Sequence, residues 1–226
     1  YSESDYLTGI GYKALQNNTN GSNLTALGTF ALQYNTTGSN NFAQGYHALN
    51  IVQSGSNNFA QGYNALRCNT ASNNTAIGYQ ALYRNTRGNN NIGIGYQGLC
   101  SNTCGNHNVA LGQQTLGSNT TGCYNTFIGL LAGYNNTYGC NNFFAGCGAG
   151  CSNISGGYNT FIGFVAGRYN TTGSNNTAIG LCALYNTTNG DSNTAIGYKA
   201  LVNNTSGCNN FAQGCCALGN NTSGSD

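Results

Sequence analysis

The chain has 226 residues and a formal net charge of +2, and only 4% of its residues are charged, against roughly a quarter in ordinary soluble domains. Its six basic residues are scattered, which disfavours nucleic-acid binding. The best apolar runs, 126–132 and 160–166, are far shorter than the about 20 residues of a membrane span. The composition therefore favours a structural role over a catalytic one.

A 17-residue repeat organises nearly the whole chain. Its marker glycine recurs every 17 residues, with one step of 16, at Gly11, Gly28, Gly45, Gly62, Gly78, Gly95, Gly112, Gly129, Gly146, Gly163, Gly180, Gly197 and Gly214. We number the unit positions 1–17 with this glycine at position 5. The chain then divides into an N-terminal extension, 1–6, and a single domain of 13 units, 7–226, as in a solenoid.

Positions 1–5 of each unit predict a β-strand, at 7–11, 24–28, 41–45, 58–62, 74–78, 91–95, 108–112, 125–129, 142–146, 159–163, 176–180, 193–197 and 210–214. Positions 2 and 4 share one strand face and change together. They are usually Thr with Ile or Leu, but Phe with Gln at 42 and 44, at 59 and 61, and at 211 and 213. We therefore expect the side chains of this outer face to pack against another chain or against another wall of β-strands.

Positions 3 and 9 predict the core. Ten units have Ala or Gly at position 3 and Leu at position 9, as in Ala76 and Leu82. Close-packed interiors exchange large for small residues at constant volume, and three units show that exchange. We therefore expect positions 3 and 9 to touch, as in the pairs Phe127–Gly133, Phe144–Gly150 and Phe161–Gly167.

The remaining positions predict turns and ladders. Gly at position 15, present in twelve units, is expected to supply a positive φ, and Asn at position 1, present in eleven, a stacked amide ladder. No apolar stripe of helical period persists. The sequence therefore predicts an all-β fold, a β-solenoid (β-roll or β-helix) of 13 stacked coils, with rungs about 4.8 Å apart and roughly 60 Å of length.

The units Asn-Thr-Ala-Ile-Gly at 74–78, 176–180 and 193–197 resemble the left-handed β-roll head repeats of trimeric autotransporter adhesins. They are also similar to the Asn-Thr-Ala-Ile-Gly-Tyr-x-Ala-Leu repeats of tail-fibre-like surface proteins. The resemblance covers nearly the whole chain. It implies a surface fibre or adhesin of stacked β-coils, often a homotrimer, on a cell or virion.

Cysteine carries chemical information of its own. Cys123 and Cys140 occupy position 16 of consecutive units, one rung apart, and we predict a disulfide between them. The total of 11 is odd, so at least one thiol stays free or pairs between chains. A metal bound by Cys100 and Cys104, or by Cys147 and Cys151, is an alternative, and no cofactor is expected. A cysteine share of about 5% favours an oxidising, extracellular setting.

Asn-x-Ser/Thr sequons predict N-linked glycans, mostly in the outer turn at unit positions 11 and 12. The alternative is that the turn chemistry creates sequons as a by-product. The candidates are Asn17, Asn35, Asn119, Asn135, Asn153, Asn170, Asn186, Asn203, Asn204, Asn220 and Asn221.

Catalysis is not expected. The sequence offers no carboxylate pair, and His47 and His107 stand in distant units without acidic neighbours. Tyrosines at position 6 predict a stacked ladder, with a carbohydrate-binding stripe as the alternative.

We therefore expect an extracellular structural protein that forms a fibril by head-to-tail stacking, because regular units reach both ends and open β-edges recruit further strands. One alternative is a trimeric adhesin or tail-fibre segment that binds a receptor or carbohydrate, marked by side-by-side packing of the outer strand face. Another is an ice-binding solenoid, whose Thr array at position 13 is interrupted by Gln53 and Ile154.

Overall fold

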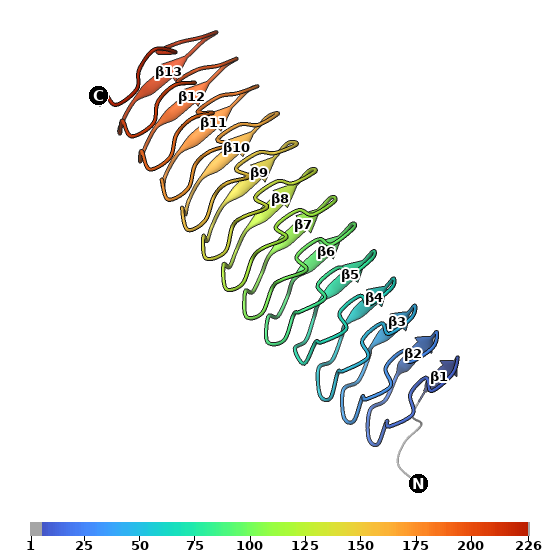
Figure 1. Cartoon of the computed structure of the whole chain (residues 1–226). Coiled ribbons are helices and arrows are strands. Elements are labelled where there is room, and N and C mark those ends of the chain that lie inside the picture. Colours follow the sequence, from blue (N-terminus) through green and yellow to red (C-terminus); the bar gives the residue numbers. More distant parts are fainter. Residues whose placement is uncertain (1–5, 226) are drawn as a thin grey trace.

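The computed structural model describes residues 6–225, which form 13 short parallel strands and no helix. Figure 1 shows the strands stacked in chain order along an elongated rod. The predicted β-solenoid is confirmed. The strands are β1 (Leu7–Ile10), β2 (Leu24–Leu27), β3 (Phe42–Gln44), β4 (Phe59–Gln61), β5 (Thr75–Ile77), β6 (Ile92–Ile94), β7 (Val109–Leu111), β8 (Thr126–Ile128), β9 (Phe143–Ala145), β10 (Thr160–Ile162), β11 (Thr177–Ile179), β12 (Thr194–Ile196) and β13 (Phe211–Gln213).

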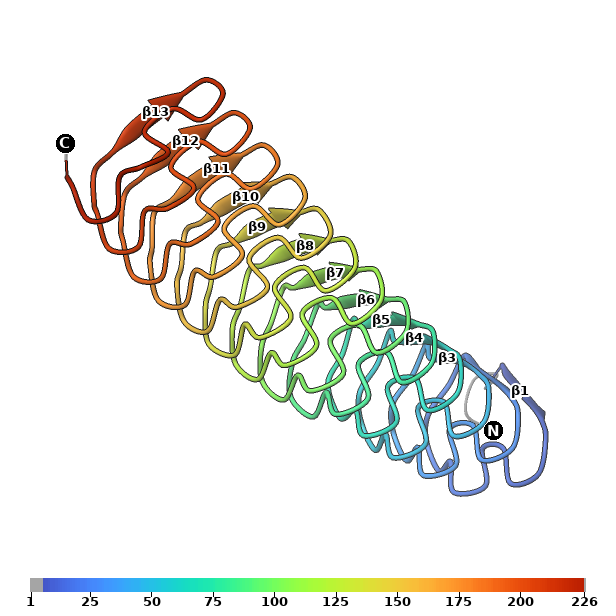
Figure 2. The same cartoon turned by 45° about the horizontal axis from the view of Figure 1, so that its top comes forward.

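Each strand pairs in parallel with its neighbours, and residues of equal unit position lie opposite each other. Thr126 pairs with Phe143, and Thr160 with Thr177. The register also holds across the shortened unit, where Phe59 faces Thr75. The one-residue deletion therefore shortens the turn and leaves the strand register unchanged. Figure 2 shows that the loops of successive coils follow the same path.

The strands are shorter than the five residues predicted, for two physical reasons. At position 5 the glycines have φ between 119° and 144°, and a Cβ at Gly45 would lie 2.5 Å from the Gly62 carbonyl oxygen. At position 1 the backbone N–H of Asn58 donates to the Asn41 side chain rather than to a strand carbonyl. Where position 1 is leucine, as at Leu24, the strand gains a fourth residue.

The expectation of a positive φ at position 15 is wrong. None of the described position-15 glycines has one; they are required by close approach, since a Cβ at Gly139 would lie 2.5 Å from the Gly156 carbonyl oxygen. Left-handed backbone occurs instead at positions 7, 9 and 17, for example at His47 (φ 53°), Leu49 (φ 47°) and Asn57 (φ 58°).

Positions 3 and 9 face each other inside the coil. Ala76 and Leu82 are both fully buried. In the three exchanged units the Phe rings stack along the axis, with centroids 4.3 Å and 4.7 Å apart from Phe127 to Phe144 to Phe161. A Cβ at Gly167 would lie 2.5 Å from Cδ2 of Phe161, so each ring fills the space that leucine occupies in the other units.

Candidate interaction surfaces

Two columns of buried asparagines, at positions 1 and 12, join most coils to the next, and the position-12 column is interrupted at Val52 and Thr187. At position 1, Asn125 Nδ2 donates to the Gly139 carbonyl at 2.8 Å, and its Oδ1 accepts the Asn142 N–H at 3.0 Å. At position 12, Asn119 Nδ2 donates to Asn102 Oδ1 at 2.7 Å. Because buried polar groups require partners, these amides bind the coils into one continuous body.

The buried ladder overturns part of the glycan prediction. Nδ2 is the atom that carries an N-linked glycan, and at position 12 it is buried and donates within the rod. The expectation of an accessible turn is therefore wrong for Asn35, Asn119, Asn153, Asn170 and Asn204. Among the other candidates, Asn186 and Asn221 are half-buried, and the exposed ones are Asn17, Asn135, Asn203 and Asn220.

The predicted disulfide between Cys123 and Cys140 is absent, and both are free thiols. Their sulfur atoms belong to a ladder at position 16, in which a side chain accepts the backbone N–H of the same position one coil earlier. Cys140 Sγ accepts the Cys123 N–H at 3.1 Å, and Cys123 Sγ accepts the Asn106 N–H at 3.2 Å. Elsewhere in the column a Ser, Asn or Asp oxygen performs the same task.

This ladder is interrupted at Gly157, which offers the Cys140 N–H no side-chain acceptor. We expect Gly157→Ser to raise the free energy of unfolding by about 1 kcal/mol, because it supplies the missing hydrogen bond and reduces unfolded-chain entropy. Its Cβ would lie 3.0 Å from the Cys140 carbonyl oxygen, so the turn must shift slightly. Denaturant unfolding measures the gain. Gly157→Ala is the matched control, and an equal gain there would contradict the hydrogen-bond explanation.

The position-6 tyrosines form a stacked column. From Tyr46 through Tyr63 and Tyr79 to Tyr96 the ring centroids are 5.2–5.3 Å apart, and the planes differ by 5–11°. Each inner ring is therefore covered on both faces by its neighbours. A sugar stacking on an aromatic residue needs a free ring face, so this run supports coil stacking rather than a carbohydrate platform.

The position-13 threonines also form hydrogen bonds between successive coils. Thr120 Oγ1 donates to the Thr137 carbonyl at 3.1 Å, and Thr137 Oγ1 to the Ile154 carbonyl at 3.2 Å. Their hydroxyl hydrogens are thus committed between coils rather than presented as a free array. This weakens the ice-binding alternative.

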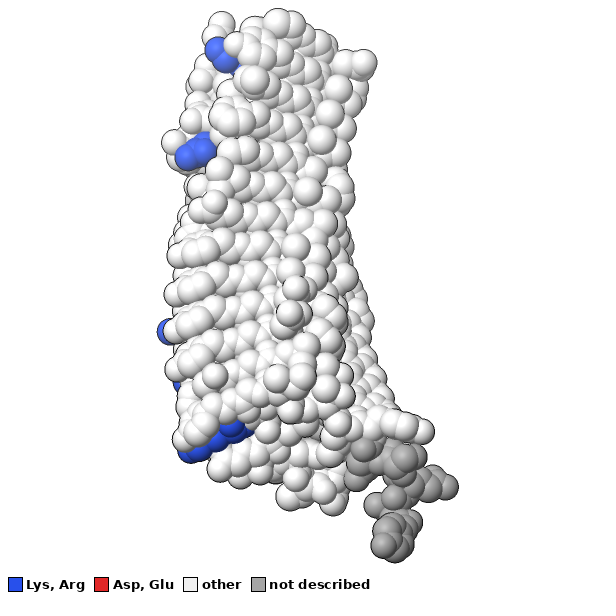
Figure 3. All heavy atoms as spheres, turned by 90° about the vertical axis from the view of Figure 1, so that its right-hand side faces the viewer, with Lys and Arg blue, Asp and Glu red and all other residues white. Residues whose placement is uncertain are grey.

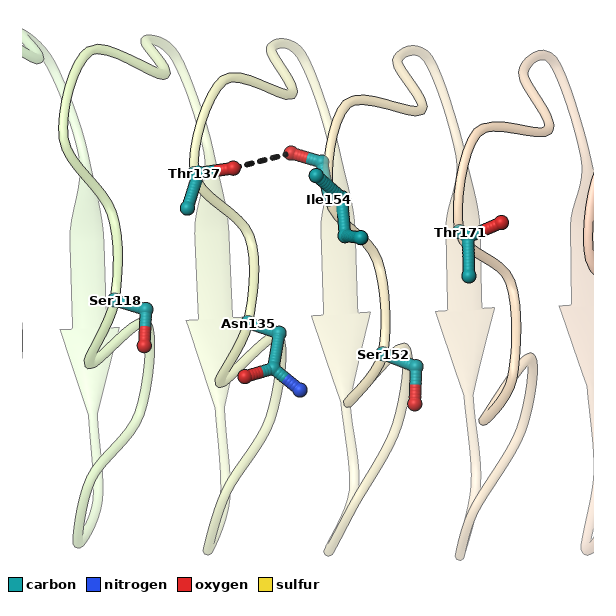
Figure 4. Close-up of a pocket in the computed structure, with 6 residues that line it drawn as sticks. All are labelled: Ser118, Asn135, Thr137, Ser152, Ile154 and Thr171. Atoms are coloured by element: carbon teal, nitrogen blue, oxygen red, sulfur yellow. Dashed lines mark hydrogen bonds between the residues drawn. The ribbon is translucent and has the colours of Figure 1, made fainter.

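A shallow groove of about 440 Å³ runs between the position-11 and position-13 columns (Figure 4). Ser118, Asn135 and Ser152 line one side, and Thr137, Ile154 and Thr171 the other. The lining holds no charged side chain and no nucleophile–base pair, so it offers hydrogen bonds but no catalytic group.

Ionisable groups do not assemble a reactive centre in the described part of the chain. Burial raises the pKa of the Cys151 thiol, an effect that outweighs the opposing influence of Arg168, so the reactive thiolate is disfavoured. The hydrogen bond with Tyr185 lowers the pKa of exposed Tyr169. Within residues 6–225 no three His, Cys, Asp or Glu side chains gather as metal ligands, and no helix suits a membrane span.

The outer side of the sheet, which we call the strand face, consists of the side chains at positions 2 and 4, bordered by position 6. None of these positions is charged in any unit. In the view of Figure 3 the basic atoms lie along one margin of the rod, and no acidic atoms are visible. In the coils of β8, β10 and β11, position 4 at the end of the strand and position 6 just after it are apolar and exposed. They define an apolar patch: Ile128, Leu130, Ile162, Phe164, Ile179 and Leu181.

The hydrogen bonds between coils have a fixed direction. N–H groups at positions 2, 9 and 11 donate to the following coil, as from Thr177 to the Asn193 carbonyl at 2.8 Å. N–H groups at positions 5, 7 and 17 donate to the preceding coil, as from Gly180 to the Ile162 carbonyl at 2.8 Å. The two faces of a coil are therefore different and complementary.

The end coils of the described chain present these groups without a neighbouring coil. The β13 coil offers the N–H groups of Phe211, Leu218 and Asn220, and the β1 coil offers the carbonyls of the matching positions 1, 8 and 10. Core residues are uncovered too: Leu218 is 49% exposed, whereas Leu201, one coil earlier, is fully buried.

No protein-family model, no curated protein and no solved structure matches the chain. Its function is therefore inferred from the geometry of its own surfaces.

Proposed function

We propose that the protein is an extracellular structural protein that lengthens into a fibre by head-to-tail stacking of its solenoids. The observation that carries the proposal is that the two faces of a coil are different and complementary, so that one solenoid can stack on another. The β13 coil of one copy offers the kinds of donor and acceptor that inner coils offer to their successors, and the β1 coil of the next copy offers the partners. A contact that is heterologous and does not close produces a filament.

The side chains support such a junction. Leu218 of one copy would be covered by Leu15 of the next, as Leu201 is covered by the coil that follows it. Asn210 Oδ1 would accept the Leu7 N–H, as Asn41 Oδ1 accepts the Asn58 N–H at 2.9 Å inside the rod. The junction thus repeats the bonding of an internal step. The net charge of +2 adds little repulsion between copies.

Electron microscopy of the full chain tests the proposal. We expect filaments with an axial period of about 60 Å per copy, which follows from rungs about 4.8 Å apart. Leu218→Lys would bury a charge at the junction and is expected to raise the concentration needed for filaments by about tenfold or more. The control, Thr172→Lys, adds the same charge in an exposed turn and leaves filaments intact.

Two results would contradict the proposal. One is wild-type protein that stays as single rods at every concentration. The other is Leu218→Lys protein that polymerises as readily as Thr172→Lys.

A further inference from the structure

We propose that the strand face is a second self-association surface, on which another copy of this chain lies side by side, with the apolar patch at the centre of the contact. The proposal does not depend on end-to-end stacking, because the strand face lies along the side of the rod.

The patch differs from the rest of its columns. At position 6, five of the first six units carry tyrosine, whose hydroxyl suits a wet surface, but β8, β10 and β11 are followed by Leu130, Phe164 and Leu181. These three side chains are 42%, 55% and 44% exposed. The β9 coil between β8 and β10 presents the half-buried Ala145 and Cys147, neither of which is charged. Exposed apolar surface of this extent marks an interaction site more often than free surface.

The absence of charged side chains on the strand face favours a second copy of this chain as the partner. A partner that brings charged groups to the strand face would lose their hydration without gaining counter-charges, since positions 2, 4 and 6 hold none. The strand face of a second copy is equally free of charge. It also has the same rung spacing, so the side chains of two copies can interdigitate along the whole rod rather than at one point.

The available area is sufficient for a stable pair. The 13 strands form one continuous sheet. With rungs about 4.8 Å apart and three columns roughly 13 Å wide, the face measures about 800 Å² per copy, the area of a standard protein interface.

Positions 2 and 4 change together along this face. Where position 2 is phenylalanine, position 4 is Gln or Ala, as in Phe42 with Gln44 and Phe143 with Ala145. Phe42 and Phe59 stack with centroids 4.7 Å apart and planes differing by 5°. Aromatic rings that are stacked in this way along the face offer apolar area to a second sheet.

The test compares charged variants of the patch in the full chain. The double variant Ile128→Lys/Ile162→Lys places two like charges in the contact, and Ile128→Glu/Ile162→Glu is its mirror. Sedimentation gives the mass, and electron microscopy separates the two modes of assembly. Lateral pairing doubles the width of a rod at constant length, whereas end-to-end stacking lengthens a rod of single width.

We expect wild-type protein to form rods of double width. Each charged variant should form rods of single width, with the pair dissociation constant raised about a hundredfold or more, and mixing the Lys and Glu variants should restore double width. The control Thr172→Lys is expected to pair as wild type does. Ile162→Gln, which places the residue found at position 4 of β3, β4 and β13, serves as a milder variant if the lysines impair folding, and it too should weaken pairing.

Single-width wild-type rods at every concentration would overturn the proposal. So would charged variants that pair like wild type, or bundles of three rods, which would make the contact a trimer.

Discussion

Replacing Phe144 by alanine is expected to lower the free energy of unfolding by about 3–5 kcal/mol, the usual cost of removing a fully buried phenylalanine. Phe144 lies between two other rings, with centroids 4.3 Å from Phe127 and 4.7 Å from Phe161, so its removal also ends both stacking contacts. Denaturant unfolding of the full chain measures the loss.

The partner residue gives a sharper form of this prediction. Gly150→Leu alone is expected to destabilise the coil, because a Cβ at Gly150 would overlap the Phe144 ring. The double variant Phe144→Ala/Gly150→Leu recreates the Ala76–Leu82 arrangement and is expected to unfold within about 1.5 kcal/mol of wild type. The left-handed backbone at position 9 is no obstacle, since Leu82 adopts it with φ 52°. Losses that simply add in the double variant would show that positions 3 and 9 do not compensate.

Asn125→Ala is expected to lower the free energy of unfolding by about 1–3 kcal/mol, the usual cost of leaving one buried group without its hydrogen-bond partner. The variant leaves the Asn142 N–H without its 3.0 Å acceptor. The Gly139 carbonyl loses its 2.8 Å donor but keeps Asn136 Nδ2, which donates to it at 3.0 Å. The measurement is again the free energy of unfolding in denaturant.

Asn135→Ala is the matched control, since the Asn135 side chain is exposed in the groove between positions 11 and 13. It is expected to change stability by no more than about 0.5 kcal/mol. Equal effects of the two substitutions would mean that the amide ladder does not stabilise the rod.

The β-solenoid could be predicted because the same unit positions make the same packing contacts in every coil. The 17-residue spacing places equal positions opposite each other, and the Phe127–Gly133 exchange reveals a contact across the core from sequence alone. The strand ends were not predictable in the same way. They depend on whether position 1 offers a side-chain acceptor, as Asn41 does. The asparagine column is visible in the sequence, but it does not tell whether the amide oxygens accept from the backbone or from other side chains.

The surface was harder to predict, because adjacent residues of one type have opposite environments. Asn135 at position 11 is exposed and Asn136 at position 12 is fully buried, although the sequence Asn-Asn-Thr makes them look equivalent. For Cys123 the rung spacing alone predicts a disulfide, whereas its sulfur accepts a backbone N–H. The apolar patch has a signal in the sequence, the replacement of tyrosine by Leu130, Phe164 and Leu181 at position 6.

The left-handed residues at positions 7, 9 and 17 also bear on how the chain folds. Such backbone is costly for residues other than glycine, and Leu49 adopts it (φ 47°) where its N–H reaches the Ala65 carbonyl of the next coil at 3.0 Å. A lone coil therefore lacks the hydrogen bonds to neighbouring coils that offset the cost of this backbone. The first stable folding nucleus needs several coils in contact. After nucleation, each coil forms against the one before it. Folding therefore propagates along the rod one coil at a time, and each step forms the same kinds of hydrogen bond and core contact.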